Sequence, residues 1–243
     1  MPNPTAAMLV IGDEILSGRT QDTNTNHLAN ALTAQGIDLR EVRVVPDEQP
    51  AIANALNDLR ARFDHVFTSG GIGPTHDDIT ADAVAAAFGV PVGVRDDARA
   101  AMQAFYDTIG GKLTPSRLRM ARIPQGATLI DNEISGAPGF TIGNVHVMAG
   151  VPSVFKAMVA GLLPTLAGGA PVQSRSLRVE RGESEIAEEL AALAADFPDL
   201  SIGSYPFRQE GIFGTNIVVR GQDGARVDKA FARLSDLFAE NRA

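Results

Sequence analysis

Hydrophobic positions follow two different periods over the first two-thirds of the chain. Some segments are short, nearly continuous apolar runs, which are typical of strands buried on both faces of a sheet. These predicted strands cover residues 7–11, 39–45, 65–68 and 145–148. The segments between them carry apolar residues along one helical stripe. These predicted helices cover residues 23–34, 50–62, 81–88 and 96–109, and another follows residue 152. Strand–helix alternation with short connections predicts a mainly parallel sheet with helices on both faces.

The pattern changes after the segment Gly168–Pro171, which is rich in turn-forming residues. Beyond it we expect strands over residues 174–180, 200–206 and 216–220, and helices over residues 183–195 and 224–240. The order strand, helix, strand, strand, helix suits a small α+β subdomain rather than a continuation of the parallel sheet. We therefore divide the chain into a domain of residues 1–170 and a subdomain of residues 171–243.

The chain carries 21 basic and 29 acidic side chains, a formal net charge of −8, and no cysteine. The absence of cysteine excludes disulfides and thiol nucleophiles, and it fits a cytoplasmic location. The acidic balance argues against nucleic acid or an anionic membrane as a partner. An apolar stretch over residues 157–172 is too short to span a bilayer and is interrupted by Pro164. We expect a soluble, cytoplasmic protein.

A glycine-rich segment follows the third predicted strand, between residues 68 and 80. Glycines directly after a buried strand let the backbone turn sharply and present N–H groups to a phosphate. Asp77 and Asp78 follow in the same loop, and carboxylates are ligands that Mg²⁺ prefers. The segment therefore favours a magnesium–phosphate site, while the alternative is a plain turn in which Asp78 or Thr80 caps the next helix. The candidate ligand-binding residues here are Ser69, Gly70, Gly71, Gly73 and Thr75.

Acidic and amide side chains also follow the first predicted strand. Glu14 can supply a second cation ligand, and Asn24 can orient a hydroxylated ligand. The alternative is that Glu14 is a solvated charge and that Asp22 or Thr23 caps the next helix. Because the carboxyl ends of parallel strands meet at one edge, we expect these turns and the glycine-rich segment to lie together.

One more turn and one histidine complete the set of candidates. Gly150 opens a strand-to-helix turn whose amides can reach an anion, and Lys156 lies one turn into the helix. The alternative is that this turn only starts the helix. His76 lies in the glycine-rich segment and is the candidate proton shuttle. His65 and His146 fall inside predicted strands, so we interpret them as structural.

Taken together, these motifs resemble the amino-terminal domain of the CinA proteins, a branch of the MoaB/Mog family of molybdopterin-binding domains. The matching segments are Gly12–Gly18 with Asp22–Asn24, Ser69–Thr75 with Asp77–Thr80, Gly136–Phe140, Gly150–Ser153 with Lys156, and Arg181–Ser184. They occur in the right order and cover almost the whole chain. The resemblance implies a three-layer α/β/α domain that is often oligomeric and binds a small phosphorylated ligand at the glycine-rich loop.

The resemblance also implies a chemistry. CinA-like domains are associated with metal-dependent hydrolysis of ADP-ribose and related pyrophosphates, and a similar domain is fused to eukaryotic FAD synthases. The family places a divalent cation (Mg²⁺ or similar) on the acidic residue of the loop, which here is Asp78, with Asp77 beside it. From the positions of the residues we expect Glu14 or Asp77 to share this cation. We expect water to attack one phosphorus while Asp77 or His76 takes its proton.

Two alternatives to a hydrolase remain open. One is a non-catalytic module that binds molybdopterin or a nucleotide for a partner protein. The other is a degenerate relative whose subdomain mediates assembly. The presence of Asp78, Asn24 and the loop glycines argues against degeneracy.

Overall fold

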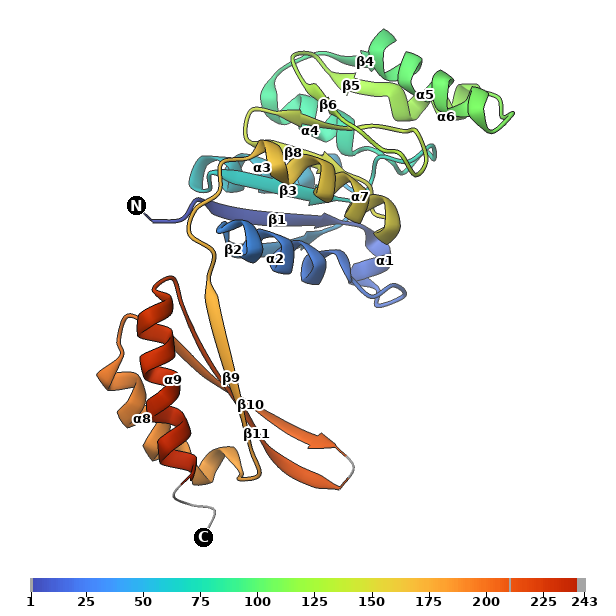
Figure 1. Cartoon of the computed structure of the whole chain (residues 1–243). Helices are drawn as coiled ribbons and strands as arrows, with labels where there is room; N and C mark the ends of the chain where they lie inside the picture. Colours follow the sequence, from blue (N-terminus) through green and yellow to red (C-terminus); the bar gives the residue numbers. More distant parts are fainter. Residues whose placement is uncertain (1, 210, 240–243) are drawn as a thin grey trace. The chain divides into compact units, whose positions relative to one another are not determined.

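The computed structural model describes residues 2–209 and 211–239 of the chain. It divides into two compact units, Met1–Gly169 and Ala170–Ala243, which we describe separately (Figure 1). The division falls within the predicted Gly168–Pro171 boundary segment. Among the described residues, no helix has both the length and the apolar character that a membrane crossing requires.

A six-stranded mixed sheet forms the centre of the N-terminal unit, in the order β2-β1-β3-β8-β7-β6. Its parallel part consists of β2 (Asp38–Val45), β1 (Thr5–Ile11), β3 (His65–Ser69) and β8 (Val145–Met148). An antiparallel edge follows, made of β7 (Gly139–Ile142) and β6 (Thr128–Ile130). The apolar pattern predicted the four parallel strands. The two antiparallel strands were not recognised, because segments of three and four residues are too short to show a hydrophobic periodicity.

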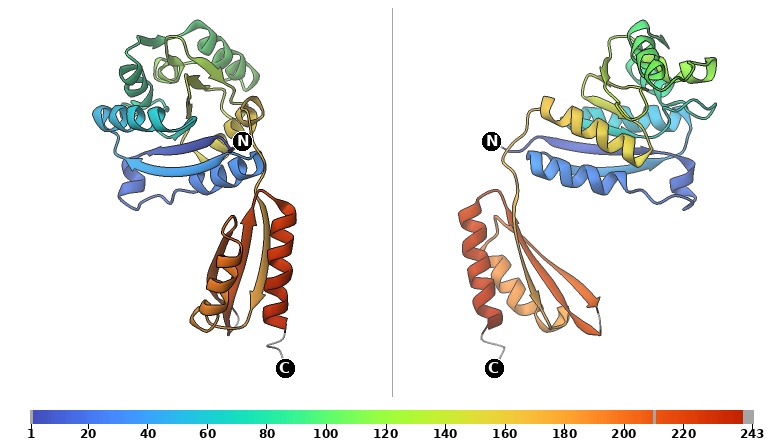
Figure 2. Two further views of the ribbon diagram at one scale, coloured as in Figure 1. Left: turned by 90° about the vertical axis from the view of Figure 1, so that its left-hand side faces the viewer. Right: turned by 45° about the vertical axis from the view of Figure 1, so that its right-hand side comes forward.

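Helices cover both faces of this sheet, so the predicted three-layer α/β/α fold is confirmed (Figure 2). On one face, Met8 packs with α2 (Asn24–Gln35) and α7 (Pro152–Leu162). On the other face, Leu9 packs with α3 (Gln49–Arg62) and α4 (Thr80–Phe88). Neighbouring side chains of a strand point to opposite faces, so the continuous apolar run in β1 supplies both cores.

Several short elements complete the N-terminal unit beyond the central sheet (Figure 1). They are α1 (Asp13–Leu16), β4 (Val92–Val94), α5 (Asp96–Thr108), α6 (Pro115–Leu118), a 3₁₀ turn (Arg119–Ala121) and β5 (Arg122–Pro124). β4 and β5 pair as a separate antiparallel ribbon. Only α5 was expected from the apolar pattern, since the other elements are three or four residues long.

The C-terminal unit is a three-stranded antiparallel sheet with two helices on one face (Figure 2). Its elements are β9 (Gln173–Val179), α8 (Ala187–Asp196), β10 (Ser201–Gln209), β11 (Ile212–Gly221) and α9 (Gly224–Ala239). The sheet order is β10-β11-β9. The helix expected over residues 183–195 is interrupted, because a 3₁₀ turn (Glu183–Glu185) precedes α8. β10 and β11 extend beyond the expected strands because they pair with each other in a long hairpin.

Candidate functional site

The glycine-rich loop leaves β3 at Ser69 and passes against the end of β1. Gly70 and Gly71 adopt φ angles of 107° and 67°, a left-handed region that favours glycine. A Cβ atom on Gly70 would lie 2.1 Å from the carbonyl oxygen of Ile11. The loop therefore requires glycine at position 70 for both its backbone angle and its close approach to β1.

Several of the backbone N–H groups in this loop are already bonded within the protein. The Gly70 N–H donates to the carbonyl of Met148 at 3.2 Å, and the Gly73 N–H donates to the Asp78 carboxylate at 2.6 Å. Within the described chain, the N–H groups of Gly71 and Ile72 have no acceptor. These two amides follow directly after β3 and are available to an external anion.

Asp78 is bound by its own loop. Its carboxylate accepts hydrogen bonds from the N–H of Gly73, from the N–H of Thr75 at 2.8 Å and from the Thr75 hydroxyl at 2.5 Å. Neither Asp78 nor Thr80 caps α4, since the cap position is Ile79 and no side chain bonds there. The Thr80 hydroxyl instead donates to the carbonyl of Gly70 at 3.0 Å. Both side chains shape the loop.

Asn24 connects three of the turns that follow strands. It is buried, and its Nδ2 donates to Ser69 Oγ and to the carbonyl of Gly150, each at 2.8 Å. Its Oδ1 is buried and has no partner among the described residues. The Asp22 carboxylate accepts hydrogen bonds from the N–H of Asn24 at 2.9 Å and from that of Thr25 at 3.1 Å. Asp22 therefore bonds N–H groups in the first turn of α2, as the alternative role predicted for it from the sequence requires.

A hollow of about 50 Å³ lies beside Asn24 at the carboxyl ends of the parallel strands. Glu14, Asp22, Ser69, Gly70 and Gly150 line it together with Asn24. A second hollow, of about 10 Å³, lies on the other part of the loop and is lined by Gly73 and Asp78. Ligand pockets usually measure about 300–1,000 Å³, so neither hollow can enclose a nucleotide. A ligand of that size would extend beyond either hollow, along the rim formed by the strand ends.

Four carboxylates gather along this rim: Asp13, Glu14, Asp47 and Asp77, which we call the acidic rim. Asp47 follows β2 and accepts a hydrogen bond from the N–H of Asp13 at 2.9 Å. Partial burial raises the pKa of Asp47, and the nearby charges of Asp13, Glu14 and Asp77 raise it further. The charges of Asp13, Glu14 and Asp77 therefore disfavour the ionised form of Asp47.

Asp47 was missed at the sequence level, although it follows the second strand as Glu14 follows the first. Its position directly after a predicted strand was the signal that could have identified Asp47 as a site residue. Carboxylate oxygens and the unpartnered Asn24 Oδ1 are hard oxygen donors of the type that Mg²⁺ binds. Within the part of the chain that the structure describes, no three histidine or carboxylate groups are already close enough to hold a metal ion. Glu14 and Asp78 line different hollows.

The remaining candidates lie at the margin of this site. The side chain of His76 is 98% exposed, and its Nδ1 is 3.9 Å from Asp77 Oδ1. A hydrogen bond from Thr75 holds the pKa of Asp77 below its usual range, so Asp77 stays ionised at neutral pH. Lys156 is exposed on α7 and lines neither hollow; burial and then the Lys156 charge lower the pKa of His27.

Comparison with known proteins agrees with this architecture. Residues 7–168 match the family described as "Probable molybdopterin binding domain", and residues 171–243 match the "FAD synthase, middle domain". A CinA-like protein of Desulfosudis oleivorans is 37% identical over 209 residues, which cover 82% of this chain and 51% of that protein. A probable FAD synthase of Caenorhabditis elegans is 30% identical over 97% of this chain and 50% of its own length.

A solved structure extends the comparison to three dimensions. The crystal structure of a CinA protein of unknown function from Thermoplasma acidophilum is 34% identical. It matches 68% of this chain and 99% of its own length, with a TM-score of 0.62. The chain spans about half the length of the curated relatives named above. On these grounds the chain belongs to the MoaB/Mog family of molybdopterin-binding domains and, within it, to the CinA-like proteins.

Proposed function

We propose that the N-terminal unit binds a nucleotide pyrophosphate across its acidic rim and hydrolyses it with a divalent cation, with ADP-ribose or a related compound as substrate. The observation that carries the proposal is the buried, unpartnered Oδ1 of Asn24 beside Glu14. A buried acceptor without a donor is unfavourable, so this atom points to a hydroxyl group or a cation supplied by the ligand.

A cation is needed because the rim is negative. Asp13, Glu14, Asp47 and Asp77 would repel the phosphates of a nucleotide. A divalent cation supplies charge neutralisation at the phosphoryl oxygens when it is bound. Glu14 and Asp47 are the side chains that we expect to hold it; burial, and then the neighbouring charges, raise the pKa of Asp47. Asp78 remains a predicted cation ligand, although in this structure its carboxylate oxygens accept hydrogen bonds from the loop.

The chain's own groups would carry out the rest of the reaction. The free N–H groups of Gly71 and Ile72 would hold phosphate oxygens, because preorganised amides stabilise negative charge without reorganisation. A water molecule would attack one phosphorus and break one P–O bond of the pyrophosphate. Asp77, which is ionised and exposed, or His76 beside it would accept the proton of that water.

A direct assay tests this proposal. The full chain should release AMP from ADP-ribose in the presence of Mg²⁺ or Mn²⁺, and chelation with EDTA should abolish the reaction. Glu14→Gln should lower kcat/KM by about 100-fold and raise the Mg²⁺ concentration needed for half-maximal rate. Glu133→Gln, an exposed carboxylate outside both hollows, is the matched control. Hydrolysis that is equal in Glu14→Gln and wild type would exclude this mechanism.

The hydrogen bonding of the Asp78 carboxylate favours a second function, binding without hydrolysis. A carboxylate that accepts three hydrogen bonds from its own loop is less available to a cation than a free one. The same rim would then bind molybdopterin or a nucleotide for a partner enzyme, without turnover. Calorimetry distinguishes the two functions, because tight molybdopterin binding with no hydrolysis of ADP-ribose, FAD or NAD supports the binding module. The predicted homo-oligomer is tested by light scattering of the purified chain.

A further inference from the structure

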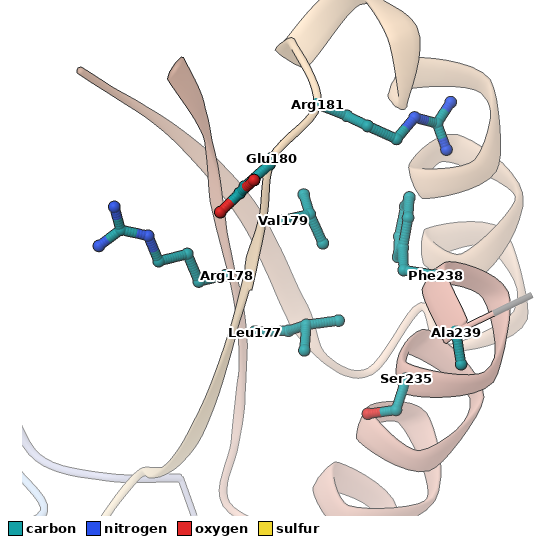
Figure 3. A pocket seen from close by; sticks show the side chains of 8 residues that line it. All are labelled: Leu177, Arg178, Val179, Glu180, Arg181, Ser235, Phe238 and Ala239. Atoms are coloured by element: carbon teal, nitrogen blue, oxygen red, sulfur yellow. The ribbon is translucent and has the colours of Figure 1, made fainter. Parts of the chain in front are cut away.

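Two arginines of the described chain have a buried guanidinium nitrogen without a hydrogen-bond partner: Arg119 at Nε and Arg181 at Nη1. A buried donor without an acceptor is unfavourable, so each of these atoms calls for an explanation. Arg181 lies at a cleft of about 880 Å³ between β9 and α9 of the C-terminal unit (Figure 3). Its Nη2 is 3.3 Å from the Glu189 carboxylate, and its Nε is 3.9 Å from that of Glu185. Arg119 has no such carboxylate partner among the described residues.

Arg119 lies beside the glycine-rich loop. It belongs to the 3₁₀ turn that precedes β5, and it lines the same hollow of about 10 Å³ as Ile72, Gly73 and Asp78. Its side chain is half-buried, and no group within the described chain accepts a hydrogen bond from it. Among its guanidinium nitrogens only Nε is enclosed by protein, so the terminal nitrogens reach the surface. Arg119 therefore brings an unpaired positive charge to the loop.

The other charged side chains of this hollow are already bonded. Arg122 donates to both carboxylate oxygens of Asp82, at 2.8 and 2.5 Å. The Asp78 carboxylate accepts three hydrogen bonds from its own loop, which disperse its negative charge. Among the charged side chains that line the hollow, Arg119 is thus the one without a partner in the described chain.

The neighbours of Arg119 hold its backbone in place. Ala121, at the end of the same turn, is fully buried, and its carbonyl accepts a hydrogen bond from the N–H of Arg95 at 3.0 Å. Arg122 follows and is tied to Asp82 of α4, the helix that begins directly after the glycine-rich loop. The turn and the loop are therefore attached to the same helix, so the charge of Arg119 stands beside the loop before a ligand arrives.

The size of the hollow limits which part of a ligand can enter it. A space of about 10 Å³ holds roughly one water molecule, so it has room for one phosphoryl oxygen and not for a base or a sugar. A guanidinium binds phosphate through two parallel N–H groups, and Nε with one terminal nitrogen forms such a pair. Ile72, whose N–H has no acceptor in the described chain, lines the same hollow. Both groups are donors that suit a phosphate oxygen.

We propose that Arg119 is a phosphate-binding residue, which holds one phosphoryl oxygen of the ligand in the hollow beside Asp78. This assignment rests on the proposed ligand, a nucleotide pyrophosphate, and identifies the side chain that recognises its charge. The cation expected on Glu14 and Asp47 then serves one phosphate, and Arg119 serves the other. The role of Arg119 does not require hydrolysis, so it applies equally if the rim only binds its ligand.

Calorimetry of the full chain in Mg²⁺ tests this role, with the α,β-methylene analogue of ADP as the probe. Its P–C–P bridge is not hydrolysed, so affinity is measured apart from turnover. Arg119→Met removes the charge and every side-chain N–H, and it should weaken binding by about 10- to 100-fold. Arg119→Lys keeps the charge without the planar fork, so its affinity should fall between the two. Arg99→Met, on the exposed side of α5 and outside the hollow, should bind as wild type does.

The stability of the ligand-free chain separates a binding role from a structural one. Arg119 makes no side-chain hydrogen bond within the described chain, so Arg119→Met should change the melting temperature by less than about 2 °C. Arg122→Met leaves Asp82 without its partner and should lower the melting temperature by at least about 3 °C. Differential scanning fluorimetry without ligand measures both variants.

The possible results distinguish this assignment from the proposed hydrolysis. Equal affinity of Arg119→Met and wild type, or equal weakening in Arg119→Met and Arg99→Met, overturns the role of Arg119 and leaves hydrolysis intact. A melting temperature of Arg119→Met as low as that of Arg122→Met also overturns it, because Arg119 would then be structural. Selective loss of affinity in Arg119→Met, without release of AMP from ADP-ribose by wild type, supports Arg119 and excludes hydrolysis. No binding of the probe by wild type overturns both.

Discussion

Asn24 Nδ2 lies 2.8 Å from Ser69 Oγ, and this hydrogen bond ties the start of α2 to the end of β3. The same amide group reaches the carbonyl of Gly150, which follows β8. Because Asn24 is buried, water cannot replace either hydrogen bond when it is lost. One side chain therefore sets the relative position of three turns that form the candidate site.

Replacing Asn24 by aspartate tests this role. The variant places an acceptor oxygen against the Gly150 carbonyl, so we expect the N-terminal unit to lose about 2 kcal/mol of stability. Urea unfolding of the full chain, with amide hydrogen exchange followed at β1 and β3, measures the loss. Asn26→Asp, two residues away and exposed, is the matched control and should change stability by less than about 0.5 kcal/mol.

Gly70→Ala tests the close approach between the glycine-rich loop and β1. Its Cβ atom would lie 2.1 Å from the Ile11 carbonyl, so the loop must move and the free amides of Gly71 and Ile72 move with it. We expect at least about 2 kcal/mol of destabilisation and loss of nucleotide binding by calorimetry. Gly18→Ala has a φ of 71° and no atom near the new Cβ, so it should cost only about 1–2 kcal/mol and keep binding.

Asp47→Asn tests whether the acidic rim holds a cation. The neutral side chain relieves repulsion from Asp13, Glu14 and Asp77, and its carbonyl oxygen can still accept from the Asp13 N–H. We expect a higher melting temperature in EDTA but a smaller rise on addition of Mg²⁺ than in wild type, because stabilisation by a ligand follows its affinity. Differential scanning fluorimetry measures both. Glu48→Gln, exposed and adjacent, should behave as wild type; an unchanged Mg²⁺ response in Asp47→Asn contradicts the assignment.

A histidine pair away from the candidate site predicts acid sensitivity. His65 Nδ1 lies 3.2 Å from His146 Nε2, and the Thr141 hydroxyl lies 3.0 Å from His146 Nδ1. Burial, and then the charge of His65, lowers the pKa of His146 to about 4. Burial also lowers the pKa of His65, against the opposing charge of Asp64. Both rings are therefore neutral in the folded protein at pH 7, which agrees with their predicted structural role.

The sign of the pH effect follows from these shifts. Below pH 6.5 the unfolded chain takes up protons that folded His146 does not, so stability is lost as the pH falls toward about 4. Over the window from pH 6.5 to 5 we expect a loss of about 2 kcal/mol from His146 alone. Urea unfolding at several pH values measures this slope. His146→Gln should flatten it, whereas exposed His76→Gln should not; identical slopes in all three proteins contradict the account.

The sequence alone was sufficient for the layers of the fold. An apolar run such as Ala7–Ile11 is typical of a strand covered on both faces, and the helical stripes containing Leu28 and Leu56 pack in the two cores that this strand supplies. It was not sufficient for β6 and β7 or for the ribbon of β4 and β5. Pairing between strands of three or four residues depends on distant partners rather than on their own periodicity.

The chemical groups of the candidate site were visible in the sequence, and their bonding was not. The sequence places several polar groups directly after predicted strands: the loop glycines, Asn24, Glu14 and the Asp77–Asp78 pair. Parallel strands bring these ends to one edge of the sheet. Only the folded chain shows that Asp78 is bound by Gly73 and Thr75, while Asp47 joins the rim from β2. The reason is physical: hydrophobic period determines which face a residue takes, but competition for hydrogen bonds is decided by the atoms that folding brings within reach.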